Sequence, residues 1–247
     1  MSTLGLILLF AVLSSVGAMS AAGAMLILPE RMMRSLVPRL VSYAIGTLLG
    51  AALLGILPHA LEQLPAGSVM TTFLAGLLGF FVLESLVLWR HCHERECPIH
   101  RVSAILILVG DAFHNFVDGL VIASAFLASA PVGVSASLAV IAHEIPQEAG
   151  DFGILLHAGY SRRKAWLLNA LSASPTLVGA LAGYAGLRAL ETAAPYVLCV
   201  SAASFVYVAL ADLIPGRRQA RGSAALGWDL LLIATGVVTI ALLHGHS

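Results

Sequence analysis

Long apolar runs dominate this sequence and constrain its fold more than any other feature. Each of eight consecutive runs holds about 20 residues or more, the length that a helix needs to cross a bilayer core of about 30 Å. They lie near residues 4–27, 35–61, 69–89, 102–129, 132–159, 164–190, 196–214 and 225–244. Charged residues make up only 11% of the 247 residues, against about 25% in soluble domains, which excludes a soluble globular enzyme. We therefore expect an all-α polytopic membrane protein with eight transmembrane helices in one domain, residues 1–247.

The basic residues predict how the spans are oriented. Twelve of the 13 Lys and Arg residues form four clusters, in or within a few residues of the breaks after the first, third, fifth and seventh runs. Because basic loops stay in the cytoplasm, these loops should be cytoplasmic and both termini extracytoplasmic. We expect an integral protein of the plasma (inner) membrane of a prokaryote. The net charge is zero, so nothing indicates a nucleic-acid partner.

A short internal similarity suggests a repeat. Residues 53–58 in the second run (Leu-Leu-Gly-Ile-Leu-Pro) resemble residues 210–215 in the seventh run (Leu-Ala-Asp-Leu-Ile-Pro). These two runs cross the membrane in opposite directions in the predicted topology. The match therefore fits an inverted repeat of three spans around a central pair, a 3+2+3 arrangement.

Polar residues are concentrated in the fourth and fifth runs, where ionisable groups are costly and mark ion pathways by default. The two sets are Asp111, His114, Asn115 and Asp118, and His143, Glu144, Gln147, Glu148 and Asp151. On a helix, His114 and Asp118 are neighbours at i,i+4, and so are Glu144 and Glu148. Each helix should therefore carry a polar stripe.

The depth of these stripes follows from the position of the turn between the two runs, near residues 130–131. In an antiparallel hairpin, Asp118 should lie level with His143, and His114 level with Gln147. These positions are about 18–20 Å from the turn, near the bilayer midplane. No Lys or Arg lies at that depth to balance the carboxylates. Imidazole, carboxylate and amide groups together suit Zn²⁺, Fe²⁺ or Mn²⁺, whereas a proton relay is the alternative.

Two stretches closely resemble the paired signatures of the ZIP (Zrt-, Irt-like protein) metal-ion transporters. They are His-Asn-Phe-Val-Asp-Gly at 114–119 and His-Glu-Ile-Pro-Gln-Glu-Ala-Gly-Asp at 143–151. The second is most similar to the subfamily with His-Glu-x-Pro-His-Glu-x-Gly-Asp in its fifth span. Residues 57–60, 81–84 and 212–215 also resemble the family, so the likeness covers nearly the whole chain.

The resemblance implies divalent metal uptake toward the cytoplasm by alternating access through a two-metal site, usually in a homodimer. His114, Asp118 and His143 would hold one metal, and Asn115 and Glu144 would lean toward the second. Glu148 would be a further carboxylate. The transported substrate would be Zn²⁺, or Fe²⁺, Mn²⁺ or Cd²⁺, with membrane lipid as surroundings and no organic cofactor.

Two positions depart from the family pattern. Gln147 replaces a His that the subfamily has there, which weakens one metal ligand, and Gly55 replaces a His that many relatives carry in the second span. We still include Gln147 in the predicted metal site. Four further residues are candidates for the metal path: His59, Asp111, Asp151 and Asp212.

The break after the third run is rich in metal-binding residue types. Its candidates for a cytoplasmic metal site are His91, Cys92, His93, Cys97 and His100. Their spacing matches no zinc-finger pattern, so an ordinary solvated loop is the alternative.

An enzyme is the competing function. His143 and Glu144 begin a stretch that resembles the His-Glu-x-x-His motif of zinc hydrolases, in which two His bind zinc and Glu acts as the base. Here Gln147 stands in place of the second His, so an intramembrane zinc-dependent hydrolase is the weaker hypothesis.

Overall fold

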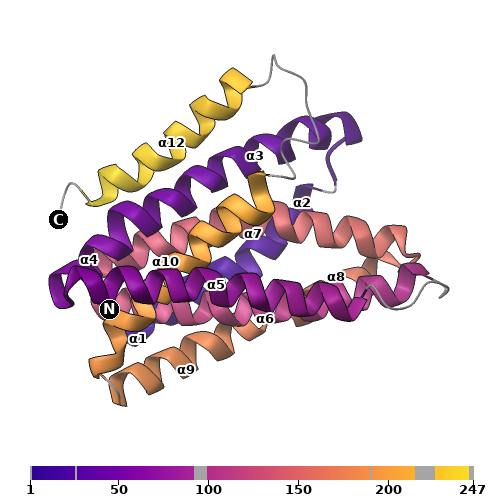
Figure 1. The fold of residues 1–247 in the computed structure, drawn as a ribbon. Coiled ribbons are helices and arrows are strands. Elements are labelled where there is room, and N and C mark those ends of the chain that lie inside the picture. The colour runs from indigo at the N-terminus through magenta and orange to yellow at the C-terminus, as the bar shows by residue number, and fades with distance from the viewer. Residues whose placement is uncertain (1, 26, 92–98, 190, 215–225, 245–247) are drawn as a thin grey trace.

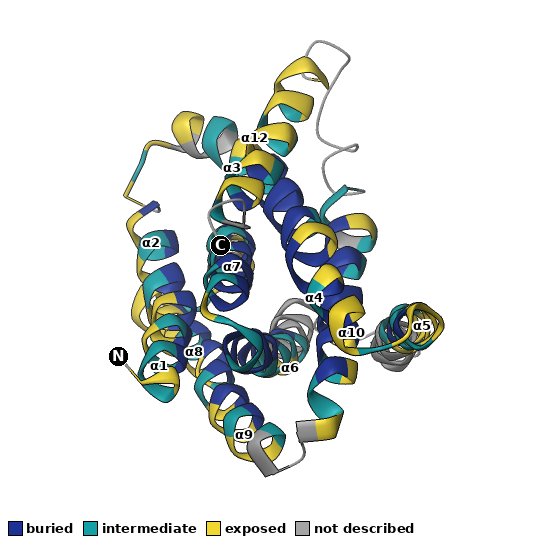
Figure 2. Cartoon of the chain, turned by 90° about the vertical axis from the view of Figure 1, so that its left-hand side faces the viewer, coloured by how far each residue is buried: buried dark blue, intermediate teal, exposed yellow. Residues whose placement is uncertain are grey.

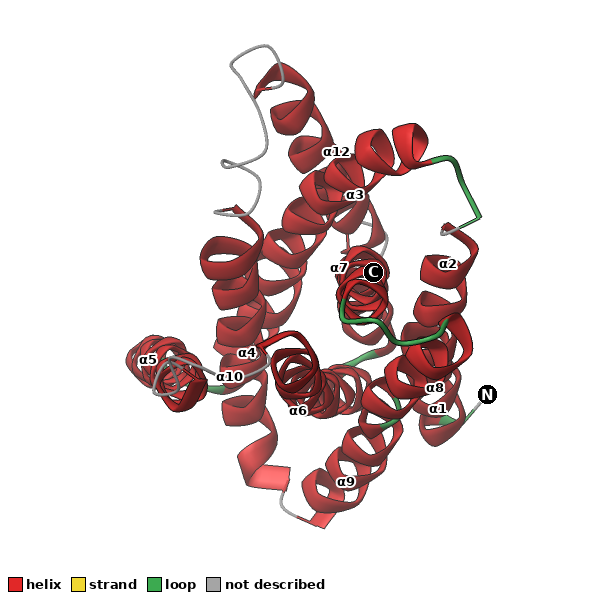
Figure 3. Cartoon of the chain, turned by 90° about the vertical axis from the view of Figure 1, so that its right-hand side faces the viewer, coloured by secondary structure: helices red, strands yellow, loops and turns green. Residues whose placement is uncertain are grey.

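The computed structural model describes all residues except 1, 26, 92–98, 190, 215–225 and 245–247. Helices make up almost all of the described chain, and no strand occurs in it (Figure 3). The segments are α1 (Thr3–Val12), η1 (Leu13–Gly17), α2 (Ala18–Met25), α3 (Glu30–Gly50), η2 (Ala51–Ile56), α4 (Leu57–Gln63), α5 (Ala66–His91), α6 (Ile99–Ala128), α7 (Ala130–His157), α8 (Arg162–Ala173), α9 (Pro175–Ala189), η3 (Glu191–Ala193), α10 (Ala194–Tyr207), η4 (Val208–Leu213) and α12 (Leu226–His244). The protein is therefore all-α, as predicted.

Each predicted apolar run coincides with one helical rod, by which we mean a single helix or two or three helical segments that follow one another directly. Among the described residues, five rods are long and apolar enough to span a membrane: Thr3–Met25, Ser35–Gln63, Arg162–Leu187, Ala194–Ala211 and Leu226–Leu243. The helices α6 and α7, which carry the predicted site residues, are not among these five. The polytopic character is thus clear, and the count of eight spans stays a prediction.

Helix ends differ from the predicted boundaries because helical hydrogen bonding does not stop where the apolar residues end. The helix α3 begins at Glu30, about one turn before the predicted start of the second run. The sixth run is divided at Ser174, between α8 and α9. Pro175 has no N–H to donate to the carbonyl of Leu171, and the Ser174 hydroxyl donates to that carbonyl instead, at 2.8 Å.

The helices α6 and α7 form an antiparallel hairpin inside the bundle. Ser129 starts α7, and its hydroxyl accepts the backbone N–H of Val132 at 3.3 Å. The helix α7 contacts α2, α3 and α6 and lies among the other helices with few exposed residues (Figure 2). Large apolar side chains on outer helices, such as Phe81, Leu171 and Trp228, are exposed instead. That distribution suits a bundle surrounded by lipid.

Packing partners are exchanged in the manner that an inverted 3+2+3 repeat requires. The helix α6 packs on α9, whereas α7 packs on η1 and α2. Similarly, α3 packs on α12, whereas α5 packs on α10. Suppose that the first, second and third rods correspond to the sixth, seventh and eighth, and the fourth rod to the fifth. The contact of α6 with α9 then corresponds to that of α7 with η1 and α2, and the contact of α3 with α12 corresponds to that of α5 with α10.

Matching π-helical segments lie where the sequence repeat is found. The N–H of Leu57 at the end of η2 donates to the carbonyl of Ala52, and the N–H of Ile214 at the end of η4 donates to that of Ala209. Both bonds join a residue to the fifth residue before it, which is the π-helical pattern. In each hexamer the donor residue is the one directly before the proline. The two similar hexamers therefore share a local backbone geometry that α-helical residues do not have.

The described chain starts and finishes at the same end of the bundle. The beginning of α1, the end of α12 and the short helix α4 gather at one end, while the turn between α7 and α8 lies at the other (Figure 1). That turn contains Gly159 in the left-handed region, with φ of 82°, which glycine adopts without steric cost. An even number of crossings would produce this arrangement of the termini.

Candidate metal centre

Four side chains converge between α6 and α7: His114 and Asp118 from the first helix, His143 and Glu144 from the second. One ligand atom from each lies within 4.8 Å of all the others. The two Nε2 atoms of the imidazoles are 3.0 Å apart. The Asp118 Oδ2 atom lies 3.2 Å from Nε2 of His143 and 3.7 Å from Nε2 of His114. The Glu144 Oε1 atom lies 3.6 Å from each Nε2 atom.

These separations are close to those of a tetrahedral metal site. Zinc binds imidazole nitrogen and carboxylate oxygen at about 2.0–2.2 Å, so that the ligand atoms of a tetrahedral site lie about 3.3–3.6 Å apart. Five of the six separations between ligand atoms are 3.0–3.7 Å and bracket this range, and the sixth, between Asp118 and Glu144, is at most 4.8 Å. A single cation at the centre could therefore contact all four groups with little movement of the side chains.

Backbone contacts fix the orientation of His143. Its Nδ1 atom lies 2.9 Å from the carbonyl oxygen of Ala139, so Nδ1 carries the proton and donates it. The Nε2 atom then presents its lone pair to the cluster, which is how metal-binding imidazoles are usually held. The ring of Phe205 in α10 meets the imidazole of His143 edge to face, with ring centroids 6.4 Å apart.

Burial makes the two carboxylates of the cluster costly without a cation. The side chains of Asp118, His143 and Glu144 are at most 1% exposed. All four carboxylate oxygens of Asp118 and Glu144 are buried without a hydrogen-bond partner. Buried polar groups in folded proteins are normally satisfied. Bare oxygens that face two imidazoles therefore point to a bound cation.

The two amides of the predicted site lie outside this cluster and are held by Asp111. Oδ1 of Asp111 accepts hydrogen bonds from Nε2 of Gln147 at 2.9 Å and from Nδ2 of Asn115 at 3.2 Å. The hydroxyl of Thr176 in α9 donates to Oδ1 of Asn115 at 2.8 Å. Oδ2 of Asp111 is buried with no hydrogen-bond partner. Asn115 and Gln147 thus form a polar layer beside the four-residue cluster.

Glu148, another predicted ligand, is directed at α8. Asn169 donates from Nδ2 to the carboxylate of Glu148, and to its backbone carbonyl at 3.1 Å. The other carboxylate oxygen, Oε1, is buried without a hydrogen-bond partner. The structure therefore brings together four of the seven residues predicted for the site and attaches the other three to neighbouring polar groups.

Thr176 and Asn169 were not predicted from the sequence. Both lie in the sixth predicted run, and each is 1% exposed. The presence of Asn169 inside a predicted span was the available signal. A threonine in a membrane helix gives no such signal, because its hydroxyl can bond within its own helix.

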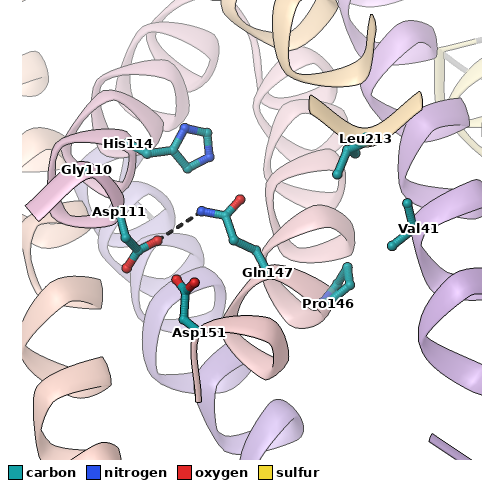
Figure 4. A pocket seen from close by; sticks show the side chains of 8 residues that line it. All are labelled: Val41, Gly110, Asp111, His114, Pro146, Gln147, Asp151 and Leu213. Carbon is teal, nitrogen blue, oxygen red and sulfur yellow. Dashed lines mark hydrogen bonds between the residues drawn. The ribbon is translucent and has the colours of Figure 1, made fainter. Parts of the chain in front are cut away.

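A cavity of about 420 Å³ reaches the cluster from one side. Its polar lining comes from Asp111, His114, Gln147 and Asp151. Figure 4 shows the Gln147 amide directed at Asp111, with the Asp151 carboxylate on the same side of the cavity. His114 belongs to both the cluster and the cavity wall, and its side chain is 20% exposed. The cavity lies on the side of the cluster that faces away from the turn at Ser129.

Apolar packing fills the opposite side, between the cluster and the turn at Ser129. Ile122, Phe126 and Val132 are buried there in the main hydrophobic core. The rings of Phe10 and Phe126 have centroids 5.2 Å apart and join α1 to α6. The hydroxyl oxygens of Ser124 and Ser201 lie 3.4 Å apart between α6 and α10. The cluster is therefore open toward one end of the bundle and closed toward the other.

The remaining predicted residues lie elsewhere. His59 is in α4, with its Nδ1 atom 3.4 Å from Oε2 of Glu62, near the end of the bundle that holds both termini. The side chains of six other candidates lie outside those described: His91, Cys92, His93, Cys97, His100 and Asp212.

Comparisons with a family model and with known proteins indicate the same family. The family model described as "ZIP Zinc transporter" matches residues 90–244. The zinc transporter ZIP13 of Pongo abelii is 33% identical over 222 residues, which cover 83% of this chain and 66% of that protein. The human zinc transporter ZIP4 is 42% identical over 140 residues, which cover 57% of this chain and 21% of that protein. The human zinc transporter ZIP10 is 38% identical over 139 residues, which cover 51% of this chain and 17% of that protein.

The aligned part of this chain thus corresponds to about two thirds of ZIP13 and about one fifth of ZIP4. The family model covers well over half of the chain, including both helices that carry the cluster. The chain therefore belongs to the ZIP zinc transporter family.

Proposed function

We propose that this protein transports a divalent metal ion, with zinc as the first candidate, through the cluster of His114, Asp118, His143 and Glu144. The spacing of the four ligand atoms, close to that of a tetrahedral site, with both buried carboxylates unsatisfied, carries the proposal. Zinc transport by ZIP13 and ZIP4, as their names state, supports zinc as the substrate. Fe²⁺, Mn²⁺ and Cd²⁺ accept the same imidazole and carboxylate ligands and are further candidate substrates.

The proposed direction is into the cytoplasm. The cavity opens from the cluster toward the end of the bundle with the turn between α7 and α8, where the basic residues predict the cytoplasm. Asp111 and Asp151 would guide the ion along it. Alternating access requires a second state in which the packing near Phe126 opens, and His59 and Glu62 would then line the outer entrance.

Several finer features belong to the same proposal. A second metal would sit toward Asn115 and Glu144, next to the first. Asp212 and the His- and Cys-rich stretch around 91–100 would provide metal contacts nearer the cytoplasm. The protein would act as a homodimer in a prokaryotic plasma membrane, although the relatives compared above are eukaryotic.

The hydrolase alternative is not favoured. Its motif needs a second ligand at position 147, and Gln147 bonds to Asp111 instead. The family to which the chain belongs consists of transporters. A proton relay remains the other candidate use of the same groups.

Uptake into liposomes tests the proposal. Purified protein in vesicles loaded with a zinc-sensitive dye should admit Zn²⁺, and Asp118→Ala or His143→Ala should lower the initial rate by about tenfold or more, since each removes a metal ligand. Thr71→Ala is the control, because this exposed hydroxyl on α5 bonds only to carbonyls of its own helix, and α5 carries no residue of the cluster.

Two results would contradict the proposal. Metal binding without flux in tight vesicles would revive the hydrolase, which a peptide or lipid hydrolysis assay would then test. Proton movement without any metal uptake would identify a proton relay. Circular dichroism and size-exclusion profiles should show that both alanine variants remain folded.

A further inference from the structure

A second cavity, of about 610 Å³, lies outside the metal path, between α2, α7 and α8. Its lining residues are Ser20, Gly23, Ala24, Ile27, Phe152, Leu156, Arg162, Arg163 and Trp166. It is lined by Ser20, Gly23 and Ala24 of α2 and by Ile27, which follows the end of that helix. We call this cavity the α2–α8 groove.

The α2–α8 groove combines an apolar floor with two positive charges. Ala24, Phe152 and Leu156 provide apolar surface, while Arg162 and Arg163 stand at the first turn of α8. No acidic residue is among those that line it. Such a groove is complementary to a ligand that has an anionic head and an apolar tail.

The third basic residue of this turn is used differently. The ammonium group of Lys164 lies 5.1 Å from the centroid of the Tyr160 ring, a distance typical of a cation–π contact. Lys164 does not line the groove. Arg162 and Arg163 therefore line the groove, whereas Lys164, the next residue and of the same charge, does not.

The location of the groove indicates the source of such a ligand. It lies at the end of the bundle with the turn between α7 and α8, which the basic residues predict to be cytoplasmic. Trp166, 44% exposed, stands at its edge, where tryptophans at membrane interfaces are common. Basic pockets between helices on this side of a membrane are suited to anionic lipid head groups.

We propose that the α2–α8 groove binds one anionic phospholipid. Its phosphate contacts Arg162 and Arg163, and one acyl chain lies against Ala24, Phe152 and Leu156. The bound lipid joins α2, α7 and α8, and α8 also carries Asn169, which bonds to Glu148 beside the metal centre. This binding site does not depend on the transport proposal.

Lipid binding can be measured on the whole protein in a neutral detergent. Native mass spectrometry should show one retained molecule of dioleoyl-phosphatidylglycerol, and the same lipid should raise the thermal unfolding midpoint. Dioleoyl-phosphatidylcholine, with the same chains and no net charge, should do neither. Arg162→Gln and Arg163→Gln should each weaken phosphatidylglycerol binding by about fivefold, the value expected for one basic residue at an anionic surface.

Lys164→Gln is the matched control, because it removes one positive charge from the same turn but not from the groove. It should leave the affinity for phosphatidylglycerol unchanged. Ala24→Phe keeps every charge and fills the apolar floor, so it should also abolish retention of the lipid. It serves as the second test if an arginine variant fails to fold.

Three results would overturn the proposal. The first is that Lys164→Gln weakens binding as much as either arginine variant, which would mean a diffuse surface charge. The second is equal retention of phosphatidylcholine. The third is that glycerol 3-phosphate alone produces the full rise in unfolding midpoint, which would identify a site for a free phosphate rather than for a lipid.

Discussion

At the scale of single residues, Asp111 determines how the polar groups around the metal centre are arranged. One of its oxygens accepts both amides, those of Asn115 and Gln147. The amide nitrogen of Gln147 is thereby bound to Asp111, and the cluster consists of two histidines and two carboxylates. A site with two rather than three imidazoles should favour zinc less strongly over harder cations.

Replacement of Gln147 by His tests this arrangement. Gln147→His offers a third imidazole next to the cluster, so we expect zinc to compete more effectively against Mn²⁺ by severalfold. The measurement is uptake of radioactive zinc in the presence of increasing Mn²⁺. Unchanged competition would mean that position 147 does not contact the transported ion even when it carries a good ligand.

The hydroxyl of Thr176 supports the same network from α9. Thr176→Val keeps the shape of the side chain and removes the bond to Asn115, which should cost about 0.5–1.5 kcal/mol of stability. The thermal unfolding midpoint in detergent measures this loss. Thr71→Val on exposed α5 should leave it nearly unchanged, since that hydroxyl bonds only within its own helix.

At the scale of helices, α6 and α9 approach so closely that glycine is required at their contact. A Cβ atom on Gly179 would collide with the backbone carbonyl of Phe116, and one on Gly119 with that of Thr176. Neither obstacle is a side chain that could rotate away. The close contact lets Thr176 reach Asn115 across the two helices.

A pair of alanine substitutions on α9 tests this contact. Gly179→Ala should lower stability by about 1–3 kcal/mol, the usual cost of overpacking, and should also reduce metal binding because α6 shifts. Gly186→Ala, on the same helix with no atom within 4 Å of the added carbon, should be neutral or slightly stabilising. Similar unfolding midpoints for both variants would show that the helices can separate at little cost.

Helical periodicity predicted the positions of the polar residues along the helix axes better than it predicted their hydrogen-bond partners. The position of the turn placed Asp118 level with His143, and their atoms lie 3.2 Å apart. The same reasoning paired His114 with Gln147, whereas Gln147 bonds to Asp111. Periodicity sets which residues share a level. Which hydrogen bonds form then depends on competition among several nearby acceptors. The bonds of Asn169 and Thr176 depend on how α8 and α9 pack against the hairpin, which periodicity does not predict.

At the scale of the whole molecule, the candidate metal centre lies between a polar cavity and an apolar seal. The cavity reaches His114 from the side of Asp151, and packing around Phe126 closes the other side. Only one face of the cluster is therefore accessible in this conformation. Transport requires that access to exchange between the two ends.

Cysteine labelling tests which side is open. In a background with Cys92, Cys97 and Cys199 replaced by Ser, Gly110→Cys in the cavity wall should react with an impermeant maleimide from the predicted cytoplasmic side. Ser124→Cys, 1% exposed in the sealed half of the same helix, should react from neither side. Labelling of position 124 from outside would indicate that the seal opens readily without metal.

The paired π-helical segments have a consequence for movement between the two halves. Each segment accommodates one surplus residue, seen in the bonds of Leu57 to Ala52 and of Ile214 to Ala209. If that surplus migrates along the helix, every residue that it passes turns by about 100° and advances by about 1.5 Å, with no net loss of hydrogen bonds. Each half thus contains one such segment at the matching position, so a twist that begins at Leu57 after η2 has its counterpart at Ile214 after η4.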